Sequence, residues 1–156
     1  MEIVVYHGDV EALRPLVEAW RSQADGSFHL DMDDDCLLRR LAAMMDAEYQ
    51  AERALLVLQS NERRPLGFMG LLVTASPIGT ERIVNEHLWF VLPEHRGLSV
   101  AERFIEHAEV WGREHGCMQF SVTASRMANV QFERVCKMYE RMGFRHYETS
   151  FIREIA

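Results

Sequence analysis

The sequence contains few of the features that mark disulfide-rich, zinc-binding or membrane-spanning proteins. Its three cysteines, Cys36, Cys117 and Cys136, stand far apart in 156 residues and form no CxxC pair, so we predict neither a disulfide framework nor a metal site. No apolar run approaches the ~20 residues that a membrane-spanning helix needs, and residues 1–6 do not resemble a signal peptide. We therefore expect a soluble, cytoplasmic protein that has no membrane partner.

Positive charge is also scarce, because 17 Lys and Arg face 24 Asp and Glu for a formal net charge of -7. Such a balance does not favour a general affinity for nucleic acid or anionic membranes, and we expect no nucleic-acid partner. It suits a cationic substrate better.

The chain also lacks linkers, internal repeats and low-complexity tracts. Its length and its hydrophobic content of 48% are sufficient for one domain with one core, and we expect a single domain over residues 1–156. Residues 2–7 predict a first strand, and apolar residues at helical spacing over 13–20 predict a helix after it.

Four aspartates in the five residues 31–35 precede an apolar stripe over residues 37–45. Aspartates favour helix N-termini, where they accept hydrogen bonds from free N–H groups and meet the positive end of the helix dipole. We therefore predict a second helix that these aspartates cap. A rim that recognises a cation or binds a metal is the other interpretation of the same residues.

The rest of the sequence predicts consecutive strands first and then strands that are linked by helices. The strands predicted there cover residues 54–58, 66–74, 82–91, 118–123 and, once or twice, the tail 144–155. Two helical stripes stand between the later strands and end at Gly116 and Gly143. The order β-α-α-β-β-β-α-β-α-β indicates a mixed sheet covered by helices.

One stretch passes from a predicted strand through a short loop straight into an amphipathic helix. It reads Val91-Leu92-Pro93-Glu94-His95-Arg96-Gly97-Leu98-Ser99-Val100-Ala101. Such a loop leaves backbone N–H groups unpaired at the helix N-terminus, where they and the dipole bind a phosphate or pyrophosphate, and Arg96 would add a cation. An ordinary strand-to-helix turn with a solvated arginine explains the loop alone equally well.

A second stretch, Tyr139 to Phe144, ends the last predicted helix with a tyrosine four residues before a C-cap glycine. In this order and about forty residues apart, the two stretches resemble motifs of the GNAT superfamily of acyl-CoA-dependent N-acyltransferases. The cofactor loop of that family reads Arg/Gln-x-x-Gly-x-Gly/Ala after a strand that ends in Val-x-Pro, and its later helix ends in Tyr-x-x-x-Gly-Phe. The resemblance is clearest over residues 82–146.

The resemblance implies an α+β (mixed α/β) fold, in which a mixed, mostly antiparallel sheet of six or seven strands is flanked by about four helices. It also implies an N-acetyltransferase that uses acetyl-CoA (coenzyme A) as co-substrate. Two residues depart from the family's pattern. Ser99 stands at the usual first-helix glycine, and Phe132 stands at a frequent asparagine seven residues before the tyrosine. Serine keeps its backbone N–H, and Asn129 is the candidate to replace the missing asparagine.

In the family the amine attacks the thioester directly within a ternary complex, so the resemblance implies no catalytic cysteine. The chemistry needs a neutral amine, a donor to the thioester oxyanion and a proton for the departing thiolate. Tyr139 stands where the family often places the acid that protonates the thiolate. A core tyrosine on the helix stripe is the other interpretation of Tyr139.

Glu86 is our candidate for the base, acting directly or through a water. In a regular strand it shares a face with Val84, Leu88 and Phe90, and a carboxylate on an apolar face is costly unless it has a partner or a task. The family commonly bends this strand with a bulge, which would bring His87 into the cleft instead.

The resemblance also implies which residues hold coenzyme A. The backbone of the strand would pair with the pantetheine arm, and one of its N–H groups would serve the oxyanion. The pyrophosphate would lie on the loop. The residues implied are Leu88, Phe90, Val91 and Leu92 in the strand and Arg96, Gly97, Leu98, Ser99, Val100 and Ala101 in the loop, with Asn129 further on.

We expect the acceptor to be a small-molecule or peptide amine, which the sequence does not identify. The sequence is also compatible with a homodimer. The main alternative is a non-catalytic acyl-CoA-binding or protein-interaction module on the same fold, which the departures at Ser99 and Phe132 leave open. A dinucleotide-binding enzyme fits badly, because the chain has no GxGxxG arrangement and an antiparallel meander precedes the loop.

Overall fold

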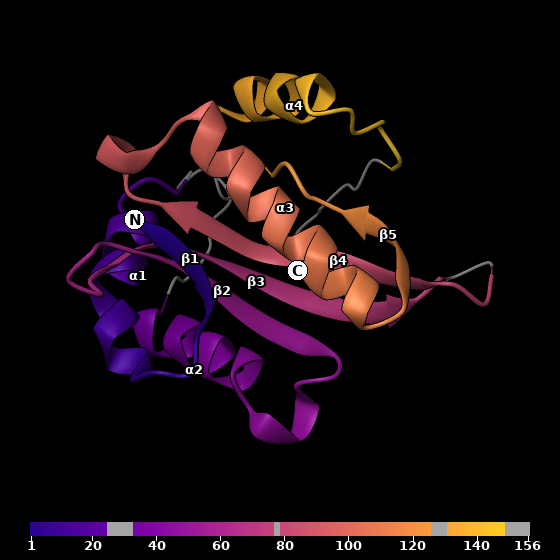
Figure 1. Ribbon diagram of the computed structural model, residues 1–156. Coiled ribbons are helices and arrows are strands. Elements are labelled where there is room, and N and C mark those ends of the chain that lie inside the picture. Colours follow the sequence, from indigo (N-terminus) through magenta and orange to yellow (C-terminus); the bar gives the residue numbers. More distant parts are fainter. Residues whose placement is uncertain (25–32, 77–78, 126–130, 149–156) are drawn as a thin grey trace, which may run out of the picture.

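The computed structural model describes residues 1–24, 33–76, 79–125 and 131–148 (Figure 1). Within this part of the chain the strands are β1 (Glu2–Val5), β2 (Arg53–Gln59), β3 (Pro65–Ala75), β4 (Arg82–Val91) and β5 (Cys117–Ser121). The α-helices are α1 (Arg14–Arg21), α2 (Asp34–Met44), α3 (Leu98–Glu114) and α4 (Phe132–Arg141). Short 3-10 helices are η1 (Val10–Leu13), η3 (Ala47–Tyr49) and η4 (Pro93–His95).

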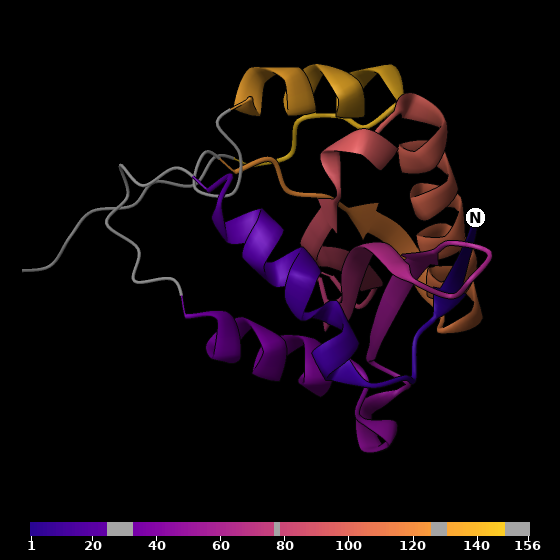
Figure 2. The same cartoon turned by 90° about the vertical axis from the view of Figure 1, so that its left-hand side faces the viewer.

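The strands form one mixed sheet in the order β1-β2-β3-β4-β5. The first three pairings are antiparallel, and β4 pairs with β5 in parallel. Figures 1 and 2 show α3 on one face of the sheet, α1 and α2 on the opposite face, and α4 across the end of the sheet beside the start of α3. The predicted mixed, mostly antiparallel sheet with four helices is therefore confirmed.

The expectation of six or seven strands is wrong for the described part of the chain, where the sheet has five. Gly143 ends α4 with a φ of 86°, a left-handed conformation that favours glycine. Phe144 then turns back, and its ring packs against Phe120 and Tyr139 at 5.8 Å between ring centroids in each case. Residues 144–148 consequently form no strand, and the rest of the predicted tail strands lies outside the described residues.

Two apolar clusters hold the layers together, one on each face of the sheet. Because side chains alternate across a strand, each central strand feeds both clusters. The cluster under α3 includes Leu56, Met69, Val84, Phe104 and Ala108. The cluster under α1 and α2 includes Leu16, Leu41, Leu55, Val57 and Phe68. Both continue to the end of β4, where Val91 belongs to the first and Phe90 to the second.

The acidic segment before α2 acts as the capping interpretation predicted. The Asp33 side chain accepts a hydrogen bond from the Asp35 N–H at 2.9 Å as the N-cap of α2. Asp34 pairs with Arg21 at 3.2 Å, and Asp35 pairs with Arg14 at 2.9 Å, so the segment also ties α2 to α1. The remaining aspartate lies outside the described residues.

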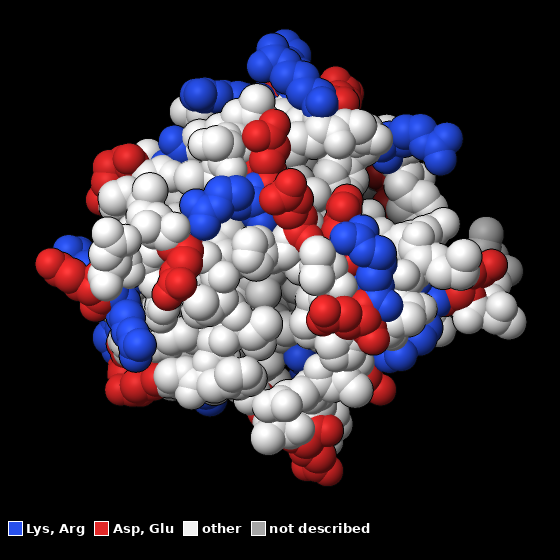
Figure 3. Space-filling view, in the orientation of Figure 1, with Lys and Arg blue, Asp and Glu red and all other residues white. Residues whose placement is uncertain are grey.

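The surface carries both signs of charge. Figure 3 shows acidic and basic side chains interspersed over the face seen in Figure 1. No helix in the described ranges is both long and apolar enough to cross a membrane.

Candidate active site

A bulge divides β4 into two parts. Opposite β3, Leu88 pairs with Gly70 and Glu86 pairs with Leu71, which leaves His87 as an extra residue. The bulge reverses the alternation of side chains, so Glu86 lies on the α3 side of the sheet. The expectation that Glu86 shares a face with Leu88 and Phe90 is therefore wrong, because both of those residues pack on the side of α1 and α2. The bulge that the family resemblance suggested is therefore present, and His87 is exposed to solvent and lines the same cleft as Glu86.

Beyond the bulge, β4 and β5 separate. They pair only from Arg82 with Cys117 to Asn85 with Ser121, where β5 ends. A cleft of about 910 Å³ opens at this point, a volume within the range of ordinary ligand sites. Its walls come from residues 86–91 of β4, the start of α3, Thr123 and Ser125 after β5, one side of α4, and Trp20 and Gln23 near the end of α1.

The backbone of β4 presents free hydrogen-bonding groups to this cleft. The Leu92 N–H donates to the Leu66 carbonyl of β3 at 3.0 Å. Because bonding directions alternate along an antiparallel pair, the N–H groups of Leu88 and Phe90 also point to β3. Those of Trp89 and Val91 point the other way, towards the cleft. Trp89 was not among the residues predicted from the sequence.

Glu86 is a buried carboxylate in the wall of the cleft, with 8% of its surface exposed. Its Oε2 accepts a hydrogen bond from the Thr123 N–H at 3.0 Å. Burial raises the pKa of this carboxyl from an ordinary 4.5 to about 7, although the Thr123 hydrogen bond acts in the opposite direction. A pKa near 7 is suited to a group that takes up a proton at neutral pH.

Tyr139 lies in the same wall and is equally buried. Its ring stacks on Trp89 with 6.2 Å between centroids, and its hydroxyl donates to the Thr123 carbonyl at 3.5 Å. Burial raises the pKa of the phenol, and the charges of Glu86 and Cys136 raise it further. The structure thus brings both predicted catalytic residues together. It adds Thr123, which sequence reasoning missed because both contacts are made by main-chain atoms.

The predicted phosphate loop reaches the same cleft. Gly97 is the N-cap of α3 in an extended conformation, without a side-chain hydrogen bond to the helix. Gly97, Leu98, Val100 and Ala101 all line the cleft, whereas Ser99 is exposed outside the lining set. The first N–H groups of a helix have no intrahelical acceptor, so the start of α3 offers donors and a positive dipole to an anion.

Arg96 contacts protein groups on three sides. Its Nε donates to the Val91 carbonyl at 2.7 Å, and its Nη2 donates to Gln23 Oε1 at 2.6 Å. The guanidinium also lies over the Phe90 ring, 5.2 Å from its centroid. Arg96 therefore joins the loop to β4 and to Gln23, which follows α1. It also lines the cleft, where the sequence predicted a cation for a bound phosphate.

Three exposed cations on α4, Arg134, Lys137 and Arg141, line the cleft and form what we call the basic rim. Their i, i+3, i+7 spacing places them on one side of the helix, which is a signal that the sequence contained. Arg134 donates to the Gln131 side chain at 3.3 Å. Neither Lys137 nor Arg141 has an ion-pair partner among the described residues. Asn129, predicted to contact the cofactor, lies outside the described residues.

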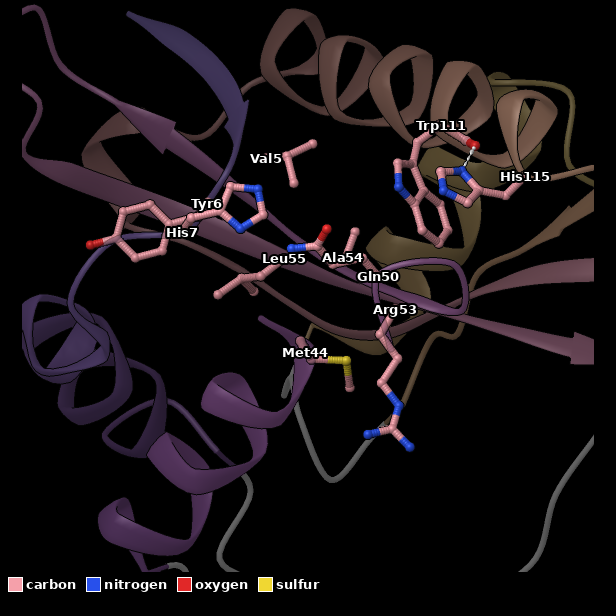
Figure 4. A pocket seen from close by; sticks show the side chains of 10 residues that line it. All are labelled: Val5, Tyr6, His7, Met44, Gln50, Arg53, Ala54, Leu55, Trp111 and His115. Carbon is pink, nitrogen blue, oxygen red and sulfur yellow. Dashed lines mark hydrogen bonds between the residues drawn. The ribbon is translucent and has the colours of Figure 1, made fainter. Parts of the chain in front are cut away.

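A second, smaller cavity of about 190 Å³ lies near the C-terminal end of α3 (Figure 4). No carboxylate lines it. His115 stacks on Trp111 at 4.2 Å between centroids, and its Nδ1 bonds the Trp111 carbonyl. Arg53 points away from both in Figure 4 and lies over the Tyr49 ring. The predicted catalytic residues and the start of α3 line the large cleft and not this cavity, so the large cleft is the candidate active site.

Comparison with known proteins agrees with this geometry. The model of the Acetyltransferase (GNAT) family matches residues 13–144. A solved structure of a probable acetyltransferase is 23% identical, with a TM-score of 0.74 over 100% of this chain and 99% of that one. A ribosomal-protein-alanine N-acetyltransferase from Brucella melitensis biovar Abortus 2308 is 17% identical, with a TM-score of 0.73 over 99% of this chain and 100% of that one.

An aminoglycoside N-acetyltransferase in complex with CoA is 18% identical, with a TM-score of 0.71 over 99% of this chain and 95% of that one. No curated protein matched the sequence. These identities show a shared fold, and the family match covers well over half of the sequence. The chain therefore belongs to the acetyltransferase (GNAT) family.

Proposed function

We propose that this protein transfers an acetyl group from acetyl-CoA to a primary amine, by direct attack of the amine on the thioester. The observation that carries the proposal is the pair formed by Glu86 and Tyr139. Both are buried in the wall of one cleft, and the pKa of Glu86 is raised to about 7. Such a pair supplies the base and the acid that amine acetylation needs.

The cleft has suitable partners for each part of acetyl-CoA, whose contribution would be the activated acyl thioester. The free N–H groups of Trp89 and Val91 suit the amides of an extended pantetheine arm. The start of α3 suits a pyrophosphate, and the basic rim suits a further phosphate. The complex of a neighbouring structure with CoA supports this assignment.

Glu86 would take the proton that the amine nitrogen loses as the new C–N bond forms. One carboxylate oxygen is already held by the Thr123 N–H, which leaves Oε1 for the amine or for a bridging water. With a pKa of about 7, about half of the Glu86 carboxyls are ionised at neutral pH. The N–H groups that point from β4 into the cleft would stabilise the charge that develops on the carbonyl oxygen.

Tyr139 would give its proton to the thiolate as the C–S bond breaks. Burial raises the pKa of this phenol most, and the charge of Glu86 raises it further. When Glu86 accepts a proton from the amine, that charge disappears and the pKa of Tyr139 falls. The phenol therefore becomes a stronger acid at the stage when the thiolate needs a proton.

The acceptor would be a small-molecule or peptide amine. Neighbours of similar fold are named for ribosomal-protein alanine and for aminoglycosides, so the fold by itself does not choose between these classes. The acceptor would approach past Trp20 and Gln23, which line the cleft on the side of α1.

Incubation with acetyl-labelled acetyl-CoA and pooled amines tests the proposal. The expected result is label in an acetylated amine, with release of one free thiol for each acetyl group transferred. A Glu86→Gln, Tyr139→Phe double variant is the matched control, since it keeps the cleft and removes both proton-transfer groups. Retention of acetyl-CoA without product in the wild-type protein would contradict the proposal and indicate a non-catalytic acyl-CoA-binding module.

A further inference from the structure

One residue touches both halves of the proposed proton-transfer pair. Thr123 lies two residues after the end of β5, and its N–H donates to Glu86 Oε2 at 3.0 Å. Its carbonyl oxygen accepts the Tyr139 hydroxyl at 3.5 Å. Both contacts use the main chain, and neither uses the threonine side chain.

We propose that Thr123 is the positioning residue of the active site, whose main chain holds the base Glu86 in place and orients the hydroxyl of the acid Tyr139. The inference rests on the proposed function for the roles of those two residues. The hydrogen bonds themselves do not depend on it.

The separation of the two strands explains why Thr123 can do this. Up to Ser121 the main chain of β5 pairs with β4. Beyond that point the strands part, and the next main-chain groups are released from the sheet. The divergence that opens the cleft therefore also frees the N–H and carbonyl of Thr123 to contact side chains.

Glu86 depends on this N–H because its surroundings offer little else to a negative charge. Opposite it on β3 lies the apolar Leu71, and its neighbour His87 is exposed. Arg96 and the cations of the basic rim line the same cleft, but none of them is among the causes that shift the pKa of Glu86, which are burial and the Thr123 hydrogen bond. The hydroxyl of Tyr139 donates to the Thr123 carbonyl. No ion pair involves Glu86 among the described residues. The Thr123 N–H is thus the group that favours ionised Glu86 against burial.

The contact with Tyr139 has a different character. At 3.5 Å it lies at the outer limit for a hydrogen bond, so it orients the hydroxyl without holding it strongly. The ring is fixed separately, by stacking on Trp89 and contact with Phe144. The hydroxyl can therefore turn from the Thr123 carbonyl to a thiolate while the ring stays in place.

Thr123→Pro provides the test, because proline removes the N–H and keeps the carbonyl. The pKa of Glu86 can be measured without substrate, by 13C NMR titration of glutamate-labelled protein, with Glu86→Gln to assign the signal. We expect the pKa to rise by about one pH unit in Thr123→Pro and to stay unchanged in the control Thr123→Ala, which loses only the side chain.

Activity gives a second measurement. If the pKa of Glu86 rises by about one, its ionised fraction at pH 7 falls from about one half to about one tenth. The value of kcat/KM at pH 7 should then fall about fivefold in Thr123→Pro and recover by pH 9. A merely structural defect would lower the rate at every pH and would not move the profile.

If circular dichroism shows that Thr123→Pro is unfolded, an ester in place of the Val122–Thr123 amide removes the same N–H with little change of shape. An unchanged pKa of Glu86 in the folded variant would overturn the positioning role. So would an equal rise in Thr123→Ala. A raised pKa in a protein whose wild type acetylates no amine would uphold the link from Thr123 to Glu86 and overturn the proposed function instead.

Discussion

The two halves of β4 differ in one respect, and the cleft follows from it. Residues Arg82 to Asn85 have a strand on each side, β3 and β5, and the Asn85 side chain adds hydrogen bonds to Thr74 and to the Leu72 carbonyl. Beyond the bulge at His87, the strand pairs with β3 alone among the described strands. Pairing on both sides leaves no main-chain group for a ligand, whereas pairing on one side leaves a row of them. The same strand thus has a structural half and a ligand-accessible half.

Among the variants beside the ligand-accessible half of β4, removal of the Tyr139 hydroxyl should lower turnover the most. Tyr139→Phe keeps the ring on Trp89, so we expect turnover to fall about 10²-fold or more while the free energy of unfolding changes by less than about 1 kcal/mol. Because the pKa of the phenol is raised, the hydroxyl stays protonated between pH 6 and about pH 9. The pH profile should therefore lose height and keep its shape. A rate within twofold of wild type would make Tyr139 a packing residue.

Glu86→Gln should lower turnover by about 10²-fold and leave the affinity for acetyl-CoA nearly unchanged. In the wild-type protein the rate should rise with pH through about 7 as Glu86 ionises, and the Gln variant should lose this rise. If the Gln variant keeps that rise and the full rate, the base is His87 or water.

The same variant has a second expected effect, on stability. The folded pKa of Glu86, about 7, lies above the ordinary 4.5, so its contribution to stability is complete below pH 4.5 and is lost as the pH rises through 7. The loss amounts to about 3 kcal/mol at most. Since glutamine stays neutral, Glu86→Gln should unfold at a higher temperature than wild type at pH 8 and at nearly the same temperature at pH 4. Equal melting temperatures at pH 8 would show that Glu86 is not a destabilising buried charge.

Lys137→Glu on the basic rim should have a smaller effect, on binding. We expect the affinity for acetyl-CoA to fall about tenfold at low salt, and the difference to shrink as the salt concentration rises. Arg145→Glu is the matched control, because it makes the same change of charge at an exposed residue outside the set that lines the cleft. Calorimetry at two salt concentrations measures both. Equal losses in the two variants would mean that only net charge matters.

Val84→Ala, in the structural half, should have the smallest effect on activity. Val84 is 1% exposed and packs under α3, so its truncation should cost about 2 kcal/mol of the free energy of unfolding. Turnover below the melting temperature should stay within twofold of wild type. A large loss of rate would show that the two halves of β4 are not separable.

The sequence predicted the elements better than it predicted their orientations. Helix ends at Gly116 and Gly143, the cap before α2 and the order of the elements as far as α4 all follow from local chemistry, and the structure confirms them. Tyr139 and Glu86 were both expected at the site. The shared face of Glu86, Leu88 and Phe90 was predicted for a regular strand only. The bulge, which the family resemblance suggested and the residues themselves did not, adds one residue and reverses the alternation.

Other parts of the site could not be predicted, for identifiable physical reasons. Thr123 acts through its main chain, so its side chain carries no signal. Trp89 faces the cleft only because of the register of β4 against β3. The basic rim could have been found, since its spacing is helical, but its position on the cleft depends on how α4 lies across the sheet.

The contacts of Arg96 determine which positions of this loop can change in sequence during evolution. The arginine holds the loop through the Val91 carbonyl, the Gln23 side chain and the Phe90 ring, so contacts with other parts of the protein fix the shape of the loop. Main-chain N–H groups at the start of α3 exist whatever side chains follow. We therefore expect a serine in place of glycine at position 99, which is exposed, to have little effect on the loop, and other exposed positions of the loop to tolerate substitution. Substitution of Arg96 itself should be selected against, because it would remove these contacts.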